Sequence, residues 1–193
     1  MFNSGIRFLA LPVVFSVLLS GCLDNANQAV NTSRIGEMLE VVMFKVSSEG
    51  NGATVGKVFI HYADDDDVTK GVRFQPALHD LPKGKHGFHV HEHPSCEPGT
   101  KDGQKIAALA AGGHYDPEST GHHEGPKGHG HLGDLPVLTV DNYGNAMAPV
   151  EAPRLSLSEL KGRSLVIHAG ADNYSDNPPL GGGGDRIACG IIQ

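Results

Sequence analysis

The chain carries 12 histidines among its 193 residues, and most of them fall into two dense clusters. The first cluster runs from His86 to His93 and reads HGFHVHEH, and the second occupies a Gly-rich stretch between His114 and Asp134. A further histidine, His168, ends the apolar run SLVIH. Because imidazole is the commonest metal ligand, two clusters and a strand histidine suggest two metal ions in one site.

The first cluster alternates in a way that predicts which side chains face that site. Successive residues of a strand point to opposite faces, so His89 and His91 share one face while Phe88 lies on the other. An aromatic side chain belongs in the core, so we expect these two histidines to point away from it. His86 lies on the same face as Phe88, and we predict a buried, hydrogen-bonded histidine there rather than a ligand.

The second cluster offers the donors of a zinc site. Three imidazoles and one carboxylate make a closed tetrahedral set that suits Zn²⁺, and this stretch supplies them as His114, His123, His131 and Asp134. The Gly and Pro residues between them let the chain wrap around a small ion. His122 is a rival to its neighbour His123 by residue type alone, and a solvated His-rich loop that binds metal loosely is the other interpretation.

The elements that must position these side chains read as short strands. We expect strands at 39–46, 53–62, 71–78, 87–91, 135–140, 146–150, 164–168 and 186–192, and a weak helix at 155–162. Short strands separated by Gly-rich turns predict an all-β sandwich or barrel. Two long irregular segments, 93–134 and 169–185, are expected to be functional loops.

The N-terminus has the pattern of an export signal, since Arg7 precedes a short apolar run and small residues follow. The run is too short to span a bilayer as a permanent helix. The stretch LSGC that ends at Cys22 resembles the lipobox of bacterial lipoproteins, which implies lipid on that cysteine; a chance cysteine after an ordinary signal is the alternative. We expect a signal peptide at 1–21, a lipidated cysteine and flexible tether at 22–37, and one domain at 38–193.

Composition limits the partners of that domain. Removing residues 1–21 removes one Arg and no acidic residue, so the formal net charge changes from −7 to −8. An acidic domain should repel nucleic acid rather than bind it. Apart from Cys22, the chain has Cys96 and Cys189, which form either a disulfide or two free thiols; an exported protein favours the disulfide.

Several motifs stand in a fixed order between residues 86 and 191. They are HGFHVH at 86–91, HYDP at 114–117, HEGP at 123–126, GHLGDL at 130–135, His168 and GGGGDRIACGI at 181–191. In this order and spacing they resemble the copper/zinc superoxide dismutases, in particular the exported bacterial branch, over residues 38–193. The resemblance implies a Greek-key β-sandwich or flattened barrel of immunoglobulin-like architecture.

The same resemblance implies one copper and one zinc ion per chain, bridged by His114. It assigns copper to His89, His91, His114 and His168, and zinc to His114, His123, His131 and Asp134. The family motif His-x-Gly-Pro selects His123 over His122, because only His123 is followed by Gly and Pro at the right offset.

Other matched residues support the metals from outside the ligand sets. Asp172 matches a carboxylate that hydrogen-bonds His89 and His123 and so orients both rings. Arg186 matches an arginine beside copper, and Lys101 matches a lysine that helps Arg186 to attract an anionic substrate.

Two further points follow from the resemblance. It pairs Cys96 with Cys189 in an intrasubunit disulfide. His93 stands where exported relatives often carry Asn, and we expect a solvated loop residue there. The resemblance gives no role to His61, His79 and His129.

The implied activity is the disproportionation of superoxide to dioxygen and hydrogen peroxide. The enzyme would be anchored to a membrane in the bacterial periplasm and would protect the envelope from superoxide. One superoxide would reduce copper and a second would oxidise it, while His114 would gain and then donate a proton. A periplasmic copper- and zinc-binding lipoprotein without this activity is the alternative; the joint presence of both ligand sets, Asp172 and Arg186 favours the enzyme. Both a monomer and a homodimer fit the resemblance.

Overall fold

The computed structural model describes Met1 and residues 37–193. The predicted signal peptide and tether, including Cys22, therefore lie outside the described residues except for Met1 and Glu37. Among the described residues, every helix falls short of the length and apolar character that a membrane span requires.

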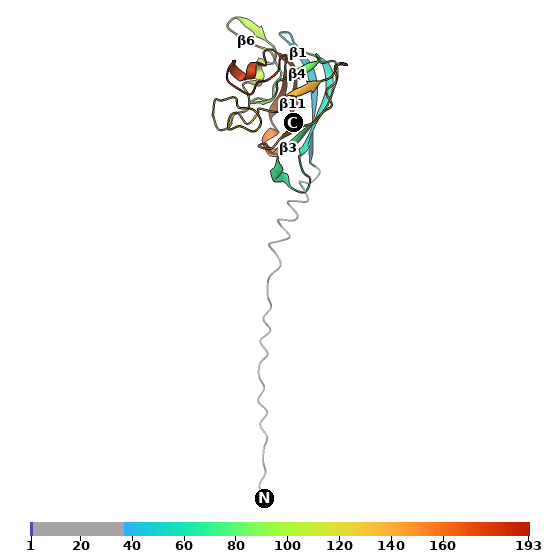
Figure 1. Cartoon of the computed structure of the whole chain (residues 1–193), viewed down its shortest axis with the longest axis vertical. Coiled ribbons are helices and arrows are strands. Elements are labelled where there is room, and N and C mark those ends of the chain that lie inside the picture. The colour runs from blue at the N-terminus through green and yellow to red at the C-terminus, as the bar shows by residue number, and fades with distance from the viewer. Residues whose placement is uncertain (2–36) are drawn as a thin grey trace. The chain divides into compact units, whose positions relative to one another are not determined.

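The described part is built almost entirely from strands (Figure 1). They are β1 (Met38–Ser47), β2 (Gly50–Tyr62), β3 (Val72–Leu78), β4 (Gly84–His86), β5 (Phe88–His91), β6 (Gly99–Lys101), β7 (Gln104–Ile106), β8 (Leu138–Val140), β9 (Val150–Ala152), β10 (Arg163–His168) and β11 (Arg186–Ile192). Four short helical segments join them: η1 (Val68–Lys70), η2 (Leu109–Ala111), α2 (Leu157–Leu160) and η3 (Pro179–Gly182).

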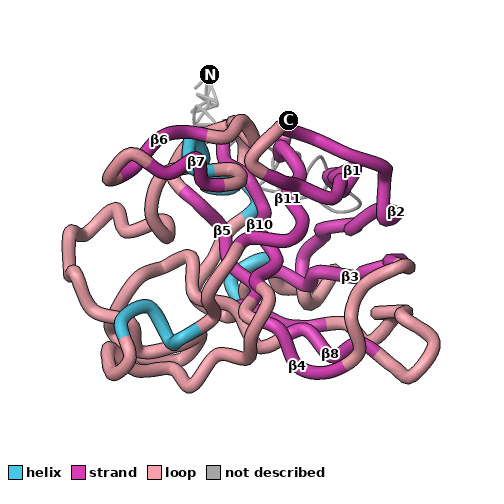
Figure 2. Tube along the Cα trace, turned by 90° about the horizontal axis from the view of Figure 1, so that it is seen from above, coloured by secondary structure: helices cyan, strands magenta, loops and turns pink. Residues whose placement is uncertain are grey.

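Seven strands form one antiparallel sheet in the order β5-β10-β11-β1-β2-β3-β9. The pairs β4-β8 and β6-β7 form two small further sheets. Figure 2 shows the sheet curling, with β4 and β8 at one end and the long loops gathered beside β5 and β10. The all-β prediction is confirmed, and the order, in which β1 lies between β2 and the last strand, is that of a Greek key.

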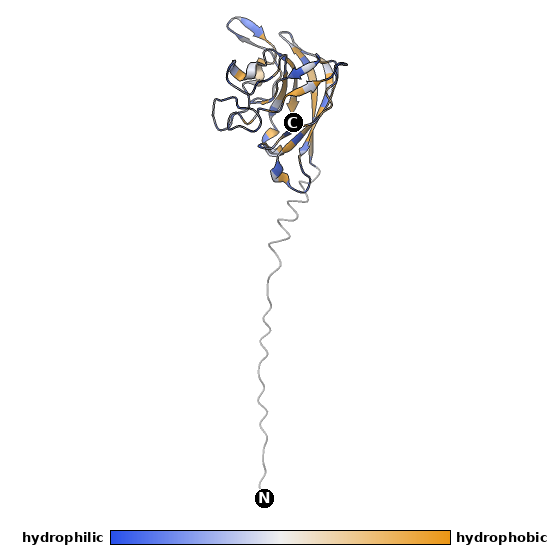
Figure 3. Cartoon of the chain, in the orientation of Figure 1, coloured by the Kyte–Doolittle hydropathy of each residue, from blue (hydrophilic) through white to orange (hydrophobic). Residues whose placement is uncertain are grey.

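The core lies inside this curl. Along β3 buried and half-buried residues alternate, and β1 begins with an alternation of exposed and buried residues, so one face of each strand packs inward. Leu138 and Val140 of β8 belong to the same core cluster as Phe74 of β3. The small β4-β8 sheet therefore closes over the large one. Figure 3 shows hydrophobic residues recurring along the strands.

Two local predictions were wrong. The strand expected at 146–150 is reduced to β9, with Ala146 making only an isolated bridge to Leu78; Pro149 has no N–H to continue a ladder. The segment 93–134, expected to be irregular, contains the β6-β7 hairpin around Asp102 and Gly103.

Candidate metal centre

The strand β5 lies at one edge of the large sheet and places the first ligand candidates. It pairs with β10 on one side. On its other side, isolated bridges join His91 to His114 and His89 to Asp134. The edge strand thus draws two distant stretches of the long loop against itself, and it brings a histidine or an aspartate beside each of its own histidines.

A glycine makes this close approach feasible. Val90 N donates to Gly133 O at 2.9 Å, and Gly133 N donates to Tyr115 O at 2.8 Å. A Cβ at position 133 would lie 2.2 Å from Val90 O, so any larger residue would push the loop, and Asp134 with it, away from β5.

The first group of donors contains the four predicted copper ligands. His89, His91, His114 and His168 are all buried, and one ring nitrogen of each lies within 4.8 Å of those of the others. Two of these residues come from β5, one ends β10 and one comes from the loop. The structure therefore brings together every residue of this predicted set.

The second group overlaps the first. His89, His114, His123 and Asp134 are buried and meet the same 4.8 Å limit. The predicted zinc ligand His131 is not in this compact group, although its Nδ1 lies 3.4 Å from Asp134 Oδ1. His89 belongs to this second group as well as to the first, because its ring lies against that of His114, with 3.9 Å between the ring centroids.

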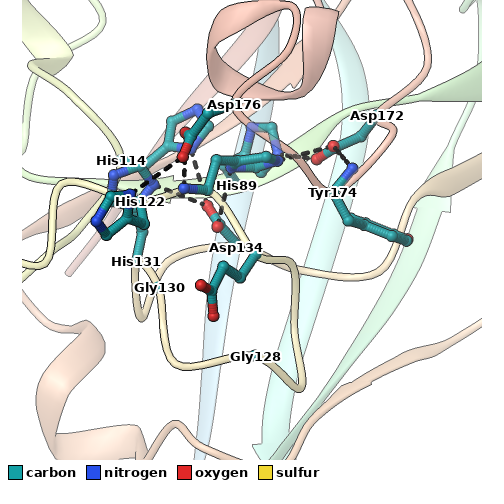
Figure 4. Close-up of polar contacts among 12 residues, drawn as sticks. His89, His114, His122, Gly128, Gly130, His131, Asp134, Asp172, Tyr174 and Asp176 are labelled. Atoms are coloured by element: carbon teal, nitrogen blue, oxygen red, sulfur yellow. Dashed lines mark hydrogen bonds and ion pairs between the residues drawn. The ribbon is translucent and has the colours of Figure 1, made fainter.

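Four of the rings are each oriented by one hydrogen bond to a group outside the ligand sets. His91 Nδ1 donates to Gly112 O and His168 Nδ1 donates to Gly184 O, both at 3.0 Å. Asp172 Oδ2 accepts from His89 Nε2 at 2.7 Å, and Asp172 Oδ1 accepts from His123 Nε2 at 2.8 Å. Figure 4 shows Asp172 beside the ring of His89. Each of these four rings is left with one nitrogen that faces the site.

The nitrogens left over define what the site can hold. Seven buried atoms of the predicted ligands make no hydrogen bond to a group outside the two ligand groups: His89 Nδ1, His91 Nε2, His114 Nε2, His123 Nδ1, His131 Nδ1, His168 Nε2 and Asp134 Oδ2. Within this set, His123 Nδ1 lies 2.9 Å from Asp134 Oδ2. Burying so many polar atoms with so few partners is costly, unless they coordinate metal. Imidazole nitrogens suit copper and zinc, and a carboxylate joining three imidazoles suits zinc. The residues present therefore fit one copper and one zinc ion.

Burial keeps most of these rings neutral. It lowers the pKa of His89 and His91 well below the usual histidine range, and repulsion from His114 lowers both further. Burial also lowers the pKa of His168 to about 4. At pH 7 these rings are in the neutral form that binds a metal.

His123 behaves in the opposite way. Burial alone would lower its pKa, but the adjacent carboxylates of Asp134 and Asp172 raise it to about 9. Burial would raise the pKa of both carboxyl groups, yet their hydrogen bonds with histidines hold it below the usual range. Without metal, His123 therefore carries a proton at pH 7, which zinc must displace.

Arg186 stands next to the first donor group. One nitrogen of its guanidinium donates to Ala108 O, and the other donates to Gly112 O at 2.7 Å. Gly112 O is also the acceptor for His91 Nδ1, so the arginine and a copper-ligand candidate share one anchor. Lys101 lies exposed in β6.

The remaining histidines lie apart from both groups. His86 is buried, with its ring nitrogens 2.8 Å from His168 O and 2.7 Å from Pro82 O, so the prediction of a hydrogen-bonded core histidine is confirmed. His122 and His93 are exposed. The other three, His61, His79 and His129, are half-buried or exposed.

The predicted disulfide is confirmed. Cys96 and Cys189 are bonded across 93 residues of sequence. The bridge ties the segment after β5 to β11, the strand that begins with Arg186. The disulfide therefore links two segments: the loop whose carbonyl oxygens hold the Arg186 guanidinium, and the strand β11 that carries Arg186.

Two residues near the site escaped the sequence analysis. Asp176 Oδ1 accepts from His123 N at 2.9 Å, and Arg154 donates to Gly128 O at 2.5 Å and Gly130 O at 2.7 Å. Both contacts hold main chain next to a predicted zinc ligand. No residue-type pattern marks them, because each depends on the path of a long loop.

Comparisons with known proteins agree with this geometry. The family described as "Copper/zinc superoxide dismutase (SODC)" matches residues 54–192. A curated relative, "Superoxide dismutase [Cu-Zn] 2" of Salmonella typhimurium, is 55% identical over 156 residues, which are 80% of this chain and 87% of the relative.

Solved structures give the same result. The Cu/Zn superoxide dismutase of Brucella abortus superposes with a TM-score of 0.77 at 52% identity, covering 81% of this chain and 100% of the other. The monomeric copper, zinc superoxide dismutase of Salmonella enterica gives a TM-score of 0.72 at 53% identity, with the same coverage.

Proposed function

This chain belongs to the copper/zinc superoxide dismutase family, and on that premise we propose which of its residues hold each metal and what they do. It is an oxidoreductase that disproportionates superoxide to dioxygen and hydrogen peroxide with one copper and one zinc ion per chain. The observation that carries the residue assignment is the set of seven buried ligand atoms that make no hydrogen bond outside the two ligand groups.

Copper is assigned to the group that β5 and β10 present. Its ligands are His89 through Nδ1 and His91, His114 and His168 through Nε2. His89 lies close to both groups, but Asp172 occupies its Nε2, so only one nitrogen remains for one metal. Its place beside His91 on the same strand assigns that nitrogen to copper.

Zinc is assigned to the loop between β7 and β8. Its ligands are His114, His123 and His131 through Nδ1, together with the carboxylate of Asp134. His114 is the bridge, because its Nδ1 lies 2.9 Å from Asp134 Oδ1 while its Nε2 is free on the other side.

When bound, copper supplies the one-electron oxidation and reduction of superoxide, and zinc, which has no redox chemistry, orders the loop. His114 Nε2, which would hold copper, would also be the atom at which the protein takes up a proton, whenever that nitrogen is not bound to copper, and returns it to the product. Arg186 is the catalytic residue that attracts superoxide and hydrogen-bonds it, because its guanidinium is fixed by two carbonyl oxygens beside His91.

The acidic charge of the chain and the anionic substrate are compatible. A positive spot in a negative surface focuses the field on the site. Arg186 provides that spot, and we propose that Lys101 on the exposed β6-β7 hairpin adds to it. The alternative, a metal-binding lipoprotein without activity, has no observation in its favour.

The ligand assignment is tested by zinc content. His123→Ala should lower zinc per chain far more than His122→Ala, because His123 Nδ1 is buried beside the carboxylate of Asp134, whereas His122 is exposed and contacts Asp176. Equal losses from the two variants would contradict the assignment.

We also propose that the enzyme works in the bacterial periplasm, anchored through lipid on Cys22. The support is the lipobox-like stretch that ends at Cys22 and a disulfide, which persists in oxidising compartments. Cys22→Ser should release the protein from the membrane fraction or block its processing. A wild-type N-terminus without the mass of a lipid would refute the proposal. A homodimer stays a prediction, tested by light scattering.

A further inference from the structure

Asp176 lies on the loop between β10 and β11, outside both ligand groups. Its Oδ1 accepts from the main-chain N of His123 at 2.9 Å. Its Oδ2 lies 3.2 Å from His122 Nδ1. The Asp176 side chain is 50% exposed, so its charge is screened by water, and any effect on the metal must come from geometry.

The same loop also holds the ring of His123. Asp172 Oδ1 accepts from His123 Nε2 at 2.8 Å, only four residues before Asp176. One carboxylate thus fixes the far edge of the ring and a second fixes the main chain from which the ring extends. Figure 4 shows the two carboxylates on the same loop, Asp172 beside the donor groups and Asp176 beside His122.

Between the two aspartates, Tyr174 docks this loop on its neighbours. Its N donates to Asp172 Oδ1 at 2.7 Å, and its hydroxyl accepts from Val137 N at 2.9 Å. Its ring packs on Gly125, where φ is +72° and a Cβ would lie 2.7 Å from the ring. The stretch 172–176 is therefore fixed firmly enough for Asp176 to set the position of another segment.

We propose that Asp176 is a positioning residue for zinc: it fixes the main chain of His123 and so holds His123 Nδ1 ready for the ion. The inference rests on the proposed assignment of His123 as a zinc ligand. Without Asp176, the ring would still be held by Asp172, but its main chain could shift. Zinc binding would then have to order this part of the loop.

Zinc affinity of the metal-free full chain tests the proposal, measured by competition with a chelator. Asp176→Ala should weaken zinc binding by about tenfold or more, as losing an outer partner of a ligand typically does. Asp176→Asn should stay within about threefold of wild type, because its amide oxygen still accepts from His123 N. His122→Ala is the matched control, since it removes only the contact at Oδ2, and it should also stay within about threefold.

A second readout separates positioning from general stability. Co²⁺ bound in place of zinc should show an altered visible spectrum in Asp176→Ala and a wild-type spectrum in Asp176→Asn. The thermal midpoint of metal-free Asp176→Ala should match that of metal-free wild type, with the loss appearing once zinc is bound.

Three results would overturn the proposal. They are a loss of affinity below tenfold in Asp176→Ala, an equal loss in His122→Ala, and an equal fall of the thermal midpoint with and without zinc. His123→Ala distinguishes this failure from that of the ligand assignment. If His123→Ala loses zinc while Asp176→Ala does not, only the positioning role is wrong; if His123→Ala keeps zinc, the assignment itself is wrong.

Discussion

Replacing Asp172 by Ala should weaken zinc binding while leaving the fold intact. Asp172 Oδ1 accepts from both His123 Nε2 and Tyr174 N, and Oδ2 accepts from His89 Nε2, at 2.7 to 2.8 Å. Alanine removes both oxygens, so the ring N–H of His123 is left buried without an acceptor. The variant loses, at His123, a charge-assisted hydrogen bond of about 1.5–3 kcal/mol.

That loss sets the size of the expected effect. A change of about 1.4 kcal/mol is tenfold in affinity, and outer partners of metal ligands typically contribute about 10- to 100-fold. We expect zinc affinity to fall within that range in Asp172→Ala, as measured by chelator competition on the metal-free chain. The side chain is fully buried, so solvent cannot replace the lost contact.

A matched control is available in the turn after β8. Asp141 Oδ1 also accepts two main-chain hydrogen bonds, from Tyr143 N and Asn145 N at 2.8 Å, but it contacts no predicted ligand. Asp141→Ala should therefore leave zinc affinity unchanged. Equal zinc affinities for Asp172→Ala and wild type would refute the claim that this carboxylate orients His123.

Three further predictions concern charge, protons and the disulfide. Arg186→Ile should keep both metals but lower the superoxide decay rate and flatten the dependence of that rate on ionic strength. Arg186→Lys and Lys101→Ala should lose less activity. An unchanged rate and an unchanged salt dependence would rule out electrostatic steering by these residues. Because the pKa of His123 is about 9 without metal, zinc binding at pH 7 should release its proton, and apparent affinity should rise with pH up to about 9 and then level off. Calorimetry in buffers of different ionisation enthalpy measures that proton, and its absence would contradict the assigned pKa. Cys189→Ser should reduce the free energy of unfolding by about 4–5 kcal/mol, because the bridge closes a loop of 93 residues; denaturant titrations that coincide with wild type would exclude this contribution.

The alternation of apolar residues predicted the strands well, and its failures have local causes. The parity of His89 and His91 correctly separated them from the core face of Phe88. It could not predict that both histidines are fully buried, since that depends on the long loops that cover β5. The hairpin around Asp102 was missed because its strands are polar, although its Asp-Gly pair is a hairpin signal.

The metal ligands could be predicted from residue types and from the family resemblance. The residues that hydrogen-bond and position those ligands could not be predicted from residue types. Asp172 could be named only by resemblance, because it lies 49 residues from His123, which it contacts. Asp176 and Arg154 were missed because contacts with main-chain groups leave no mark in residue type. The place of His131, at the margin of the zinc group, also depends on a loop path that spacing alone does not determine.

Superoxide decay followed directly in the presence of the purified chain is the most decisive measurement for this account. The chain loaded with copper and zinc should accelerate the decay, and this family is a known example of rates near the diffusional ceiling of about 10⁸–10⁹ M⁻¹ s⁻¹. The chain loaded with zinc alone should not accelerate it, since zinc has no redox chemistry. Decay at the spontaneous rate with both metals bound would contradict the assigned dismutase activity.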